Sequence, residues 1–105
     1  MLESPQRPKR EHPRVAVNLL VKLDNGVKQF FAHARDLSLT GLFLDGPVSA
    51  LPKEIGVRIP LPGQDREVVT TCRVERYSPE GVALSFAHID WSDLILVARH
   101  LAPRL

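Results

Sequence analysis

The sequence has one cysteine, one tryptophan and one tyrosine among its 105 residues, and it contains no long apolar run. A lone Cys72 cannot form an internal disulfide, so nothing in the chain points to an oxidising compartment. A transmembrane helix needs about 18 consecutive apolar residues, and the N-terminus lacks the apolar segment of a secretory signal. We therefore expect a cytoplasmic protein without membrane insertion, in which Cys72 is a small core residue.

The residue patterns that enzymes use for nucleophilic or metal-assisted catalysis are also missing. The histidines are scattered along the chain, at positions 12, 33, 88 and 100. One cysteine cannot build a structural zinc site, and His88 near Asp90 has no third ligand. Neither a phosphate-binding Walker loop nor a nucleophile-elbow motif occurs. We therefore predict that the protein is not an enzyme and that it holds no metal and no cofactor.

Charge and proline are unevenly distributed along the chain. The first 14 residues contain Arg7, Lys9, Arg10 and Arg14 against Glu3 and Glu11, and their balance of +2 equals the formal net charge of the whole chain. Residues 1–13 also contain three prolines and few apolar side chains, so they cannot form a core element. We predict a flexible basic arm over residues 1–13, followed by one folded domain over residues 14–105.

From residue 14 onward, apolar residues alternate with others, which is the period of half-buried strands. The expected strands cover residues 14–23, 28–37, 42–44, 56–61, 66–77 and 82–89, and Asp-Asn-Gly at 24–26 is a hairpin signal. Residues 90–102 show helical spacing instead, with Asp90 as N-cap and Trp91 on the apolar face. The pattern predicts an all-β fold, a small six-stranded antiparallel β-barrel with a C-terminal α-helix, because closure removes exposed strand edges.

The first of two polar stretches is REHPR at 10–14, where the arm meets the first strand. Alone, it is typical of a solvated basic tail. Pro13 disfavours helical backbone at the preceding residue, so we do not expect Arg10 and Arg14 to pair on a helix face. In a bent arm, however, both guanidinium groups could surround one ligand that carries several acceptors.

The second polar stretch is DLSLTG at 36–41, between two expected strands. Alone, it is typical of a capped turn, in which Asp36 or Ser38 bonds a nearby backbone N–H and Gly41 adopts positive φ. Arg35 also offers Asp36 an exposed ion-pair partner of little strength.

Together the two stretches resemble the PilZ domain family, which carries R-x-x-x-R before the first strand and [D/N]-x-S-x-x-G between strands. The motif positions are filled here by Arg10, Arg14, Asp36, Ser38 and Gly41. GVALSF at 81–86 also resembles the closing strand of the family, although Ala83 stands where a second glycine is frequent. The resemblance covers nearly the whole chain.

PilZ domains are receptors for cyclic di-GMP, so the resemblance implies that ligand, with its two phosphates and two guanines. Arg10 and Arg14 would engage guanine O6 and N7 or the phosphate oxygens. The Asp36 carboxylate would accept hydrogen bonds from guanine N1–H and N2–H₂, beside the Ser38 hydroxyl. Gly41 would let the backbone turn close to the ligand.

Three residues outside the motif are weaker candidates for ligand contacts: Arg7, Lys9 and Arg76. Arg7 and Lys9 could reach a phosphate, and in the family a basic residue before the first motif arginine accompanies binding of a stacked ligand pair. Arg76 or its neighbour Tyr77 could stack on a guanine face. The alternative for each of them, simple placement on the solvated surface, stays open.

The resemblance implies a bacterial second-messenger receptor that acts as an adaptor. We expect the arm to close over cyclic di-GMP and so to alter a surface that an unidentified downstream protein recognises, in motility, exopolysaccharide production or attachment. Two alternatives stay open: a PilZ-like protein-interaction module without ligand binding, and a small nucleic-acid-binding barrel that uses the basic arm. Against a nucleic-acid partner, the charges of residues 15–105 balance and aromatic residues are few.

Overall fold

The computed structural model describes residues 13–46, 48 and 50–104. The strands are β1 (Val15–Asp24), β2 (Gln29–Leu37), β3 (Gly41–Asp45), β4 (Glu54–Ile59), β5 (Val68–Ser78) and β6 (Gly81–His88). They are followed by the helix α1 (Trp91–Leu101) and a short 3₁₀ helix, η1 (Ala102–Arg104). The predicted arm, apart from Pro13 at its end, lies outside the described residues, and so do Arg7, Lys9 and Arg10.

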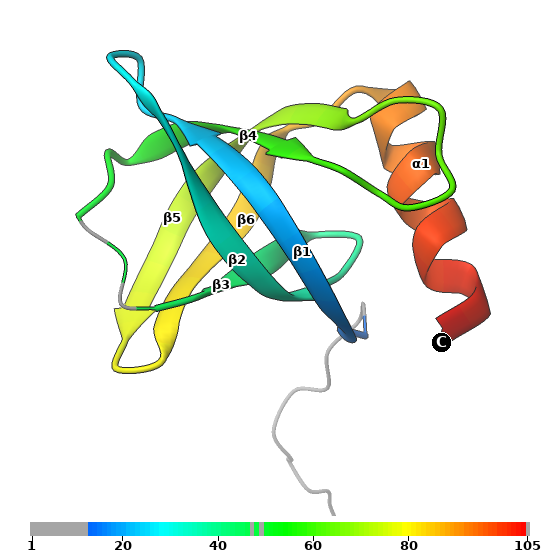
Figure 1. The fold of residues 1–105 in the computed structure, drawn as a ribbon, viewed down its shortest axis with the longest axis horizontal. Helices are drawn as coiled ribbons and strands as arrows, with labels where there is room; N and C mark the ends of the chain where they lie inside the picture. Colours follow the sequence, from blue (N-terminus) through cyan, green and yellow to red (C-terminus); the bar gives the residue numbers. More distant parts are fainter. Residues whose placement is uncertain (1–12, 47, 49, 105) are drawn as a thin grey trace, which may run out of the picture.

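The six strands form a closed antiparallel barrel in the order β1-β2-β3-β6-β5-β4, and β4 pairs back with β1 (Figure 1). The predicted six-stranded barrel with a C-terminal helix is therefore confirmed. β4 begins two residues earlier than expected and ends directly before Pro60, which has no N–H to donate to a neighbouring strand. Among the described residues, no helix is long and apolar enough to cross a membrane.

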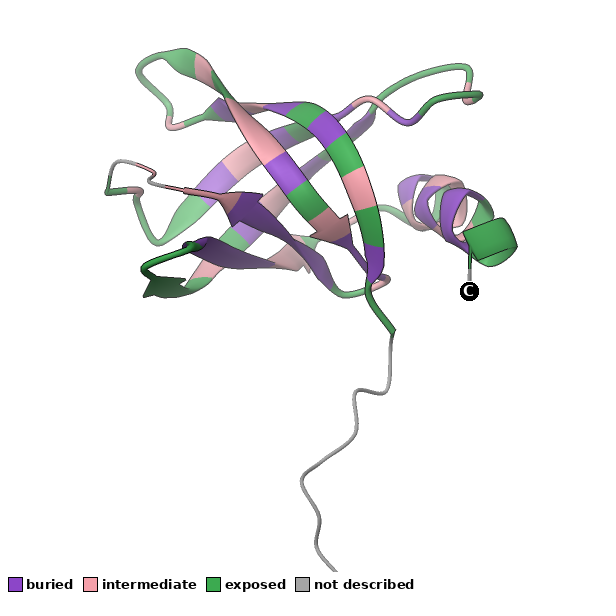
Figure 2. Cartoon of the chain, turned by 60° about the horizontal axis from the view of Figure 1, so that its bottom comes forward, coloured by how far each residue is buried: buried purple, intermediate pink, exposed green. Residues whose placement is uncertain are grey.

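The core fills the inside of the barrel with alternate residues of each strand, and Figure 2 shows the resulting bands of buried and exposed positions. Val21 and Leu23 of β1 and Val57 of β4 are almost completely buried. Cys72 of β5 is completely buried among them, as predicted, and burial raises the pKa of its thiol to about 12. The thiol therefore stays protonated at neutral pH and acts as a small apolar side chain.

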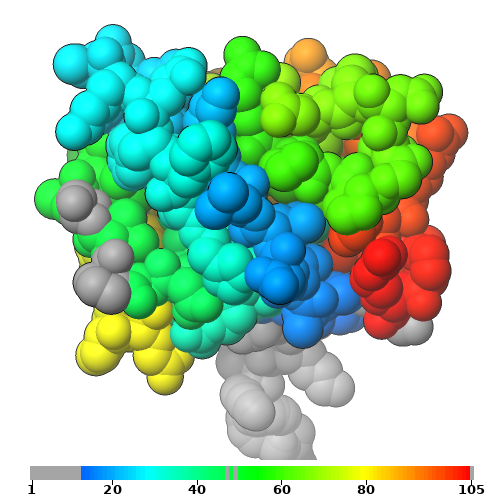
Figure 3. Space-filling view, viewed as in Figure 1, coloured from blue at the N-terminus to red at the C-terminus, as the bar shows by residue number. Residues whose placement is uncertain are grey.

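The helix α1 packs against the barrel through Val97 and Leu101, which belong to the core. The prediction that Trp91 lies on this face is wrong, because Trp91 is 74% exposed while Asp93 is buried. Two residues along a helix are about 200° apart around its axis, so these side chains point in nearly opposite directions. On the buried side, Arg66 from the loop between β4 and β5 donates to the Asp93 carboxylate at 2.5 Å. Figure 3 shows this loop, in green, beside the red helix.

The N-terminus of α1 matches the prediction in position and differs from it in bonding. Asp90 occupies the N-cap with extended backbone, but its side chain makes no capping hydrogen bond. Its carbonyl oxygen instead accepts the first bond of the helix, from the Leu94 N–H at 2.9 Å.

A β-bulge interrupts the pairing of β2 with β3. Ala34 pairs with Leu44 and Asp36 pairs with Phe43, so Arg35 is an extra residue without a partner of its own. A bulge of this kind breaks the alternation of side chains along a strand. Ala34 is completely buried, whereas Arg35 and Asp36, although adjacent in sequence, both face the outside of the barrel.

A second bulge interrupts the pairing of β5 with β6. Val74 pairs with Leu84 and Arg76 pairs with Ala83, so Glu75 is the extra residue. Val74 packs against the core, and both Glu75 and Arg76 are exposed. The two bulges therefore place pairs of neighbouring polar side chains on the outer surface of the barrel.

The turn between β2 and β3 is held by its own residues. The Ser38 N–H donates to the Gly41 carbonyl at 2.8 Å, and the Thr40 N–H donates to the Ser38 hydroxyl at 3.1 Å. Gly41 does not have the positive φ that the sequence predicted. Glycine is required for a different reason, because a Cβ at this position would lie 2.0 Å from the Leu84 carbonyl oxygen of β6.

We expect Gly41→Ala to lower the free energy of unfolding by about 1–3 kcal/mol, because the new methyl group forces β3 away from β6. Equilibrium unfolding in urea measures the effect. Gly56→Ala on β4 is the matched control, since its Cβ would meet its nearest heavy atom at 3.5 Å, an ordinary contact. That variant should be neutral or slightly more stable. Equal losses in the two variants would contradict the steric explanation.

We also expect the stability of the protein to fall in acid through His100, which is buried on α1. Burial, and then the charge of Arg104, lower the pKa of His100. The unfolded chain keeps the higher pKa of about 6.5, so protonation favours unfolding. The contribution of neutral His100 is complete above that pH and is lost as the pH falls below it. Urea unfolding at pH 8 and pH 5 should therefore show a smaller loss for His100→Gln than for the wild type, while His88→Gln, at an exposed position, should behave like the wild type.

Candidate functional site

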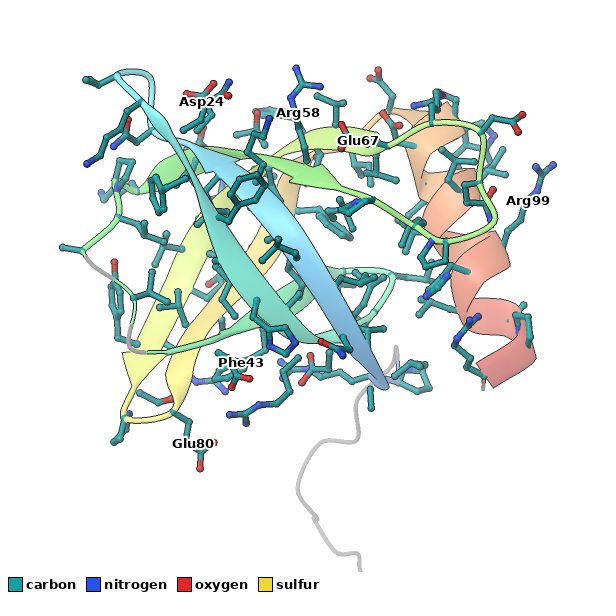
Figure 4. The ribbon with its side chains drawn as sticks, viewed as in Figure 1. Asp24, Phe43, Arg58, Glu67, Glu80 and Arg99 are labelled. Carbon is teal, nitrogen blue, oxygen red and sulfur yellow. The ribbon has the colours of Figure 1, made fainter. Side chains whose placement is uncertain are left out.

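A polar pocket of about 350 Å³ lies on the outside of the barrel, beside the turn between β5 and β6. Its lining comes from the residue before β1, from β2 and β3, and from the β5–β6 hairpin: Arg14, Arg35, Asp36, Phe43, Arg76, Ser78, Pro79 and Glu80. Figure 4 shows Phe43 and Glu80 at this end of the barrel, opposite the end that carries Asp24 and Arg58. The pocket thus gathers residues from four separate parts of the sequence.

The strand register explains why these residues meet. Ala16 pairs with Asp36, Asp36 with Phe43, Phe43 with Ala83, and Ala83 with Arg76, which makes one continuous row across five strands. Because directly paired residues face the same side of a sheet, the whole row lies on the outer surface. Because the Ala83 side chain is short, it leaves space between the larger side chains of Phe43 and Arg76.

The carboxylate of Asp36 is incompletely bonded. Its Oδ1 is buried and has no hydrogen-bond partner among the described residues. The Arg14 Nη1 lies 3.7 Å away, close enough for attraction but too far for a hydrogen bond. A buried acceptor left without a donor costs about 1–3 kcal/mol. The motif residues Arg14 and Asp36 therefore meet at a carboxylate oxygen that no described residue satisfies, and a ligand N–H group can bond it once neighbouring side chains move aside.

Arg35 does not pair with Asp36, contrary to the expectation from sequence. Its Nε and Nη2 donate to Asp45 Oδ1 at 2.9 and 2.5 Å, and its Nη1 donates to Glu80 Oε1 at 3.3 Å. The bond from Arg35, and a weaker one involving His33, lower the pKa of Asp45 despite some desolvation. The bond to Asp45 is also the main cause of a raised pKa for Arg35. Asp45 and Glu80, although more distant in sequence, thus bond the Arg35 guanidinium, and Asp36 lies next to Arg14 instead.

An aromatic ring forms the base beneath Arg35. The guanidinium carbon lies 4.9 Å from the centroid of the Phe43 ring, in cation–π contact. Phe43 faces outward on β3 and yet is only 6% exposed, so neighbouring side chains cover it. Sequence reasoning missed Phe43, Glu80 and the role of Arg35. The available signal was the run Leu-Phe-Leu at 42–44, since consecutive apolar residues indicate that both faces of a strand are covered.

The other described motif residues, Ser38 and Gly41, do not line the pocket. Ser38 is only 3% exposed, and its hydroxyl is occupied by the Thr40 N–H in the turn. In this structure both residues hold the chain that follows Asp36. Their direct contact with a ligand stays a prediction.

The structure separates Arg76 from Tyr77. Arg76 lines the pocket, as its candidacy requires, although stacking on a ligand stays a prediction. The alternation that resumes after the bulge sends Tyr77 to the other side of β5, where its hydroxyl accepts a hydrogen bond from the Leu51 N–H at 2.7 Å.

The groups that line the pocket are suited to holding a ligand. The pocket offers cationic groups, a carboxylate oxygen that no described residue satisfies, and the aromatic ring of Phe43. These groups suit a ligand that combines anionic groups with N–H donors and a flat ring system. The lining residues include no histidine or cysteine. Within the described part of the chain, no three potential metal ligands gather into one site.

The fold and the pocket together define a class: a six-stranded antiparallel barrel with a charged pocket on its outer face and a helix after the last strand. The sequence pattern of the PilZ domain family matches residues 8–102, and the chain belongs to this family. The resemblance noted from the two motifs is thereby confirmed. A comparison with curated proteins found no significant match.

Solved structures share the fold at low sequence identity. The inhibitor of motility MotI/DgrA of Bacillus subtilis has a TM-score of 0.78 at 17% identity, over 93% of this chain and 52% of that one. The PilZ domain of CeSA from a cellulose-synthesizing bacterium has a TM-score of 0.68 at 18% identity, over 87% and 96% of the two chains. The PilZ domain of YcgR from Escherichia coli, solved with c-di-GMP, has a TM-score of 0.66 at 12% identity, over 92% of each chain. This chain therefore spans about half the length of MotI/DgrA.

We expect Asp36→Ala to leave the free energy of unfolding of the ligand-free protein unchanged or to raise it, because the change removes a buried oxygen that no described residue satisfies. Arg14 would lose only a contact at 3.7 Å between partly exposed groups, which contributes little. Asp45→Ala is the contrasting variant and should be less stable, because Arg35 loses its main partner. Urea unfolding without ligand compares the two. A loss above about 1 kcal/mol for Asp36→Ala would show that its carboxylate is satisfied in solution.

Proposed function

We propose that this protein is a receptor for cyclic di-GMP and that the pocket around Asp36 is its binding site. The observation that carries the proposal is the buried Asp36 Oδ1, without a hydrogen-bond partner among the described residues and 3.7 Å from Arg14 Nη1. Membership of the PilZ family supports this ligand, and so does the likeness to the YcgR domain that was solved with c-di-GMP.

The ligand supplies the groups that the pocket lacks. Guanine N1–H and N2–H₂ are donors, and either can satisfy Asp36 Oδ1 while a second one bonds the other oxygen. Arg14 and Arg76 stand on two sides of the pocket and can engage a phosphate or the O6/N7 edge of a guanine. Ser38 and Gly41 contribute by fixing the turn that holds Asp36, in addition to any direct contact.

The arm adds the second half of the first motif. Arg14 lies where the arm joins β1 and already reaches into the pocket. We propose that residues 1–13 close over bound cyclic di-GMP, with Arg10 completing the clamp and Arg7 and Lys9 near the phosphates. Closure of this kind orders a segment and changes the surface that a downstream protein meets. The partner and its process, in motility, exopolysaccharide production or attachment, belong to the proposal.

The acidic residues of the pocket argue against a nucleic-acid partner. Asp36, Asp45 and Glu80 lie at or next to the pocket and would repel a continuous phosphate backbone. A compact ligand with two phosphates and two bases can avoid them.

Calorimetric titration with cyclic di-GMP should show binding of the wild type at about micromolar strength or tighter, which corresponds to roughly 8 kcal/mol. Arg14→Ala, Arg10→Ala and Asp36→Ala should each weaken binding by about 10- to 100-fold, because each removes hydrogen bonds to charged groups. The matched control is Arg58→Ala, at the opposite end of the barrel, where the arginine pairs with Glu67 at 3.7 Å (Figure 4). It should bind like the wild type.

Undiminished affinity in all three motif variants would overturn the proposed site. Tight, strongly salt-dependent binding of generic oligonucleotides, with no binding of cyclic di-GMP, would favour the nucleic-acid alternative instead. Binding of neither would favour a protein-interaction module.

A further inference from the structure

Arg35 belongs to neither motif. All three nitrogens of its guanidinium nevertheless donate hydrogen bonds to carboxylates at the pocket. Asp45 takes Nε and Nη2, and Glu80 takes Nη1. A guanidinium bonded along its edges in this way has few N–H groups left to donate to a phosphate. The two carboxylates also cancel its charge locally and would repel an anion. Arg35 is therefore poorly suited to binding a phosphate.

What remains available on Arg35 is the flat face of the guanidinium. The Phe43 ring lies on one side of the guanidinium, with its centroid 4.9 Å from the guanidinium carbon. The Arg35 side chain is still 44% exposed, although its edges are bonded and Phe43 lies on one side of it. Nucleobases stack on aromatic rings and on guanidinium planes. The layered arrangement of Phe43 and Arg35 thus continues naturally into a third layer, a base.

The bulge on β2 places this third layer next to the unsatisfied carboxylate. Arg35 and Asp36 are adjacent residues that face the same side of the barrel and line the same pocket. A purine stacked on Arg35 can therefore turn its hydrogen-bonding edge toward Asp36 Oδ1. Without the bulge, adjacent residues would face opposite sides of the sheet. Arg35 could then not stack on a base whose edge forms hydrogen bonds with Asp36.

We propose that Arg35, fixed by Asp45 and Glu80 above the ring of Phe43, is a preformed stacking platform for one guanine base of the ligand. The inference rests on the proposed function and adds a binding residue outside the two motifs. A platform that is already fixed before binding loses little conformational freedom when the base arrives, which favours affinity.

The test separates stacking from charge by comparing Arg35→Lys with Arg35→Ala. Lysine keeps the positive charge and can still pair with Asp45, but it has no plane on which a base can stack. Calorimetry with cyclic di-GMP should therefore show a loss of about 5- to 150-fold for both variants, which is the effect of removing an aromatic side chain on which a base stacks. Arg58→Lys, at the opposite end of the barrel, is the matched control and should retain wild-type affinity. Urea unfolding of each variant without ligand checks that the fold is kept.

A second measurement reports stacking directly. The Nε–H signal of Arg35 is identified in ¹H–¹⁵N spectra by its loss in Arg35→Lys. A purine stacked on the guanidinium should shift this proton upfield through its ring current when cyclic di-GMP is added. A purely electrostatic or structural role would leave the ring-current shift absent.

Wild-type affinity in Arg35→Lys together with a loss in Arg35→Ala would overturn the platform, because charge alone would then suffice. Wild-type affinity in both variants, or an Nε–H signal that does not move upfield, would overturn it as well. These outcomes differ from failure of the proposed function, in which the wild type does not bind cyclic di-GMP or Arg14→Ala and Asp36→Ala bind unchanged. In that case the platform falls together with the site.

Discussion

Closure of the barrel is the constraint on which the pocket depends. In a closed antiparallel barrel every strand has two neighbours, so the inward or outward direction of each side chain is fixed all the way around. Among the irregularities in strand pairing, the bulges at Arg35 and Glu75 place neighbouring polar side chains together on the outside. The row from Asp36 through Phe43 to Arg76 then lies between them. The site is therefore a consequence of strand register, completed by the short turn between β5 and β6.

The carboxylates at and next to the pocket are of two kinds. Asp45 and Glu80 are bonded to Arg35 and so are electrostatically balanced before any ligand arrives. Asp36 is left with a buried oxygen that no described residue satisfies. Keeping such a group reduces stability, and proteins retain this kind of local conflict mainly where a partner molecule resolves it. The contrast between balanced and unbalanced carboxylates marks where the ligand is expected to bind.

Much of the fold followed from local pattern, because alternation, the Asp-Asn-Gly hairpin and helical spacing each depend on a few neighbouring residues. The meeting of Arg14 with Asp36 followed from motif resemblance. The partners of Arg35 could not be predicted in this way. Asp45 and Glu80 are 10 and 45 residues away in sequence, and their distances from the Arg35 guanidinium depend on strand register and on a bulge. Trp91 was misplaced for a similar reason: which side of α1 is buried depends on contacts with other elements, among them the bond from Arg66 to Asp93.

The turn between β5 and β6 supplies the wall of the pocket through Ser78, Pro79 and Glu80, while the strands that flank it complete the barrel. Hairpin turns tolerate changes in length and sequence far better than the strands they join. Along a lineage, the exposed residues of this turn can therefore change while the strand pairing that holds Asp36 and Phe43 is kept. Different residues thus determine ligand preference and barrel stability. The domain can therefore diversify what it recognises while its architecture stays constant.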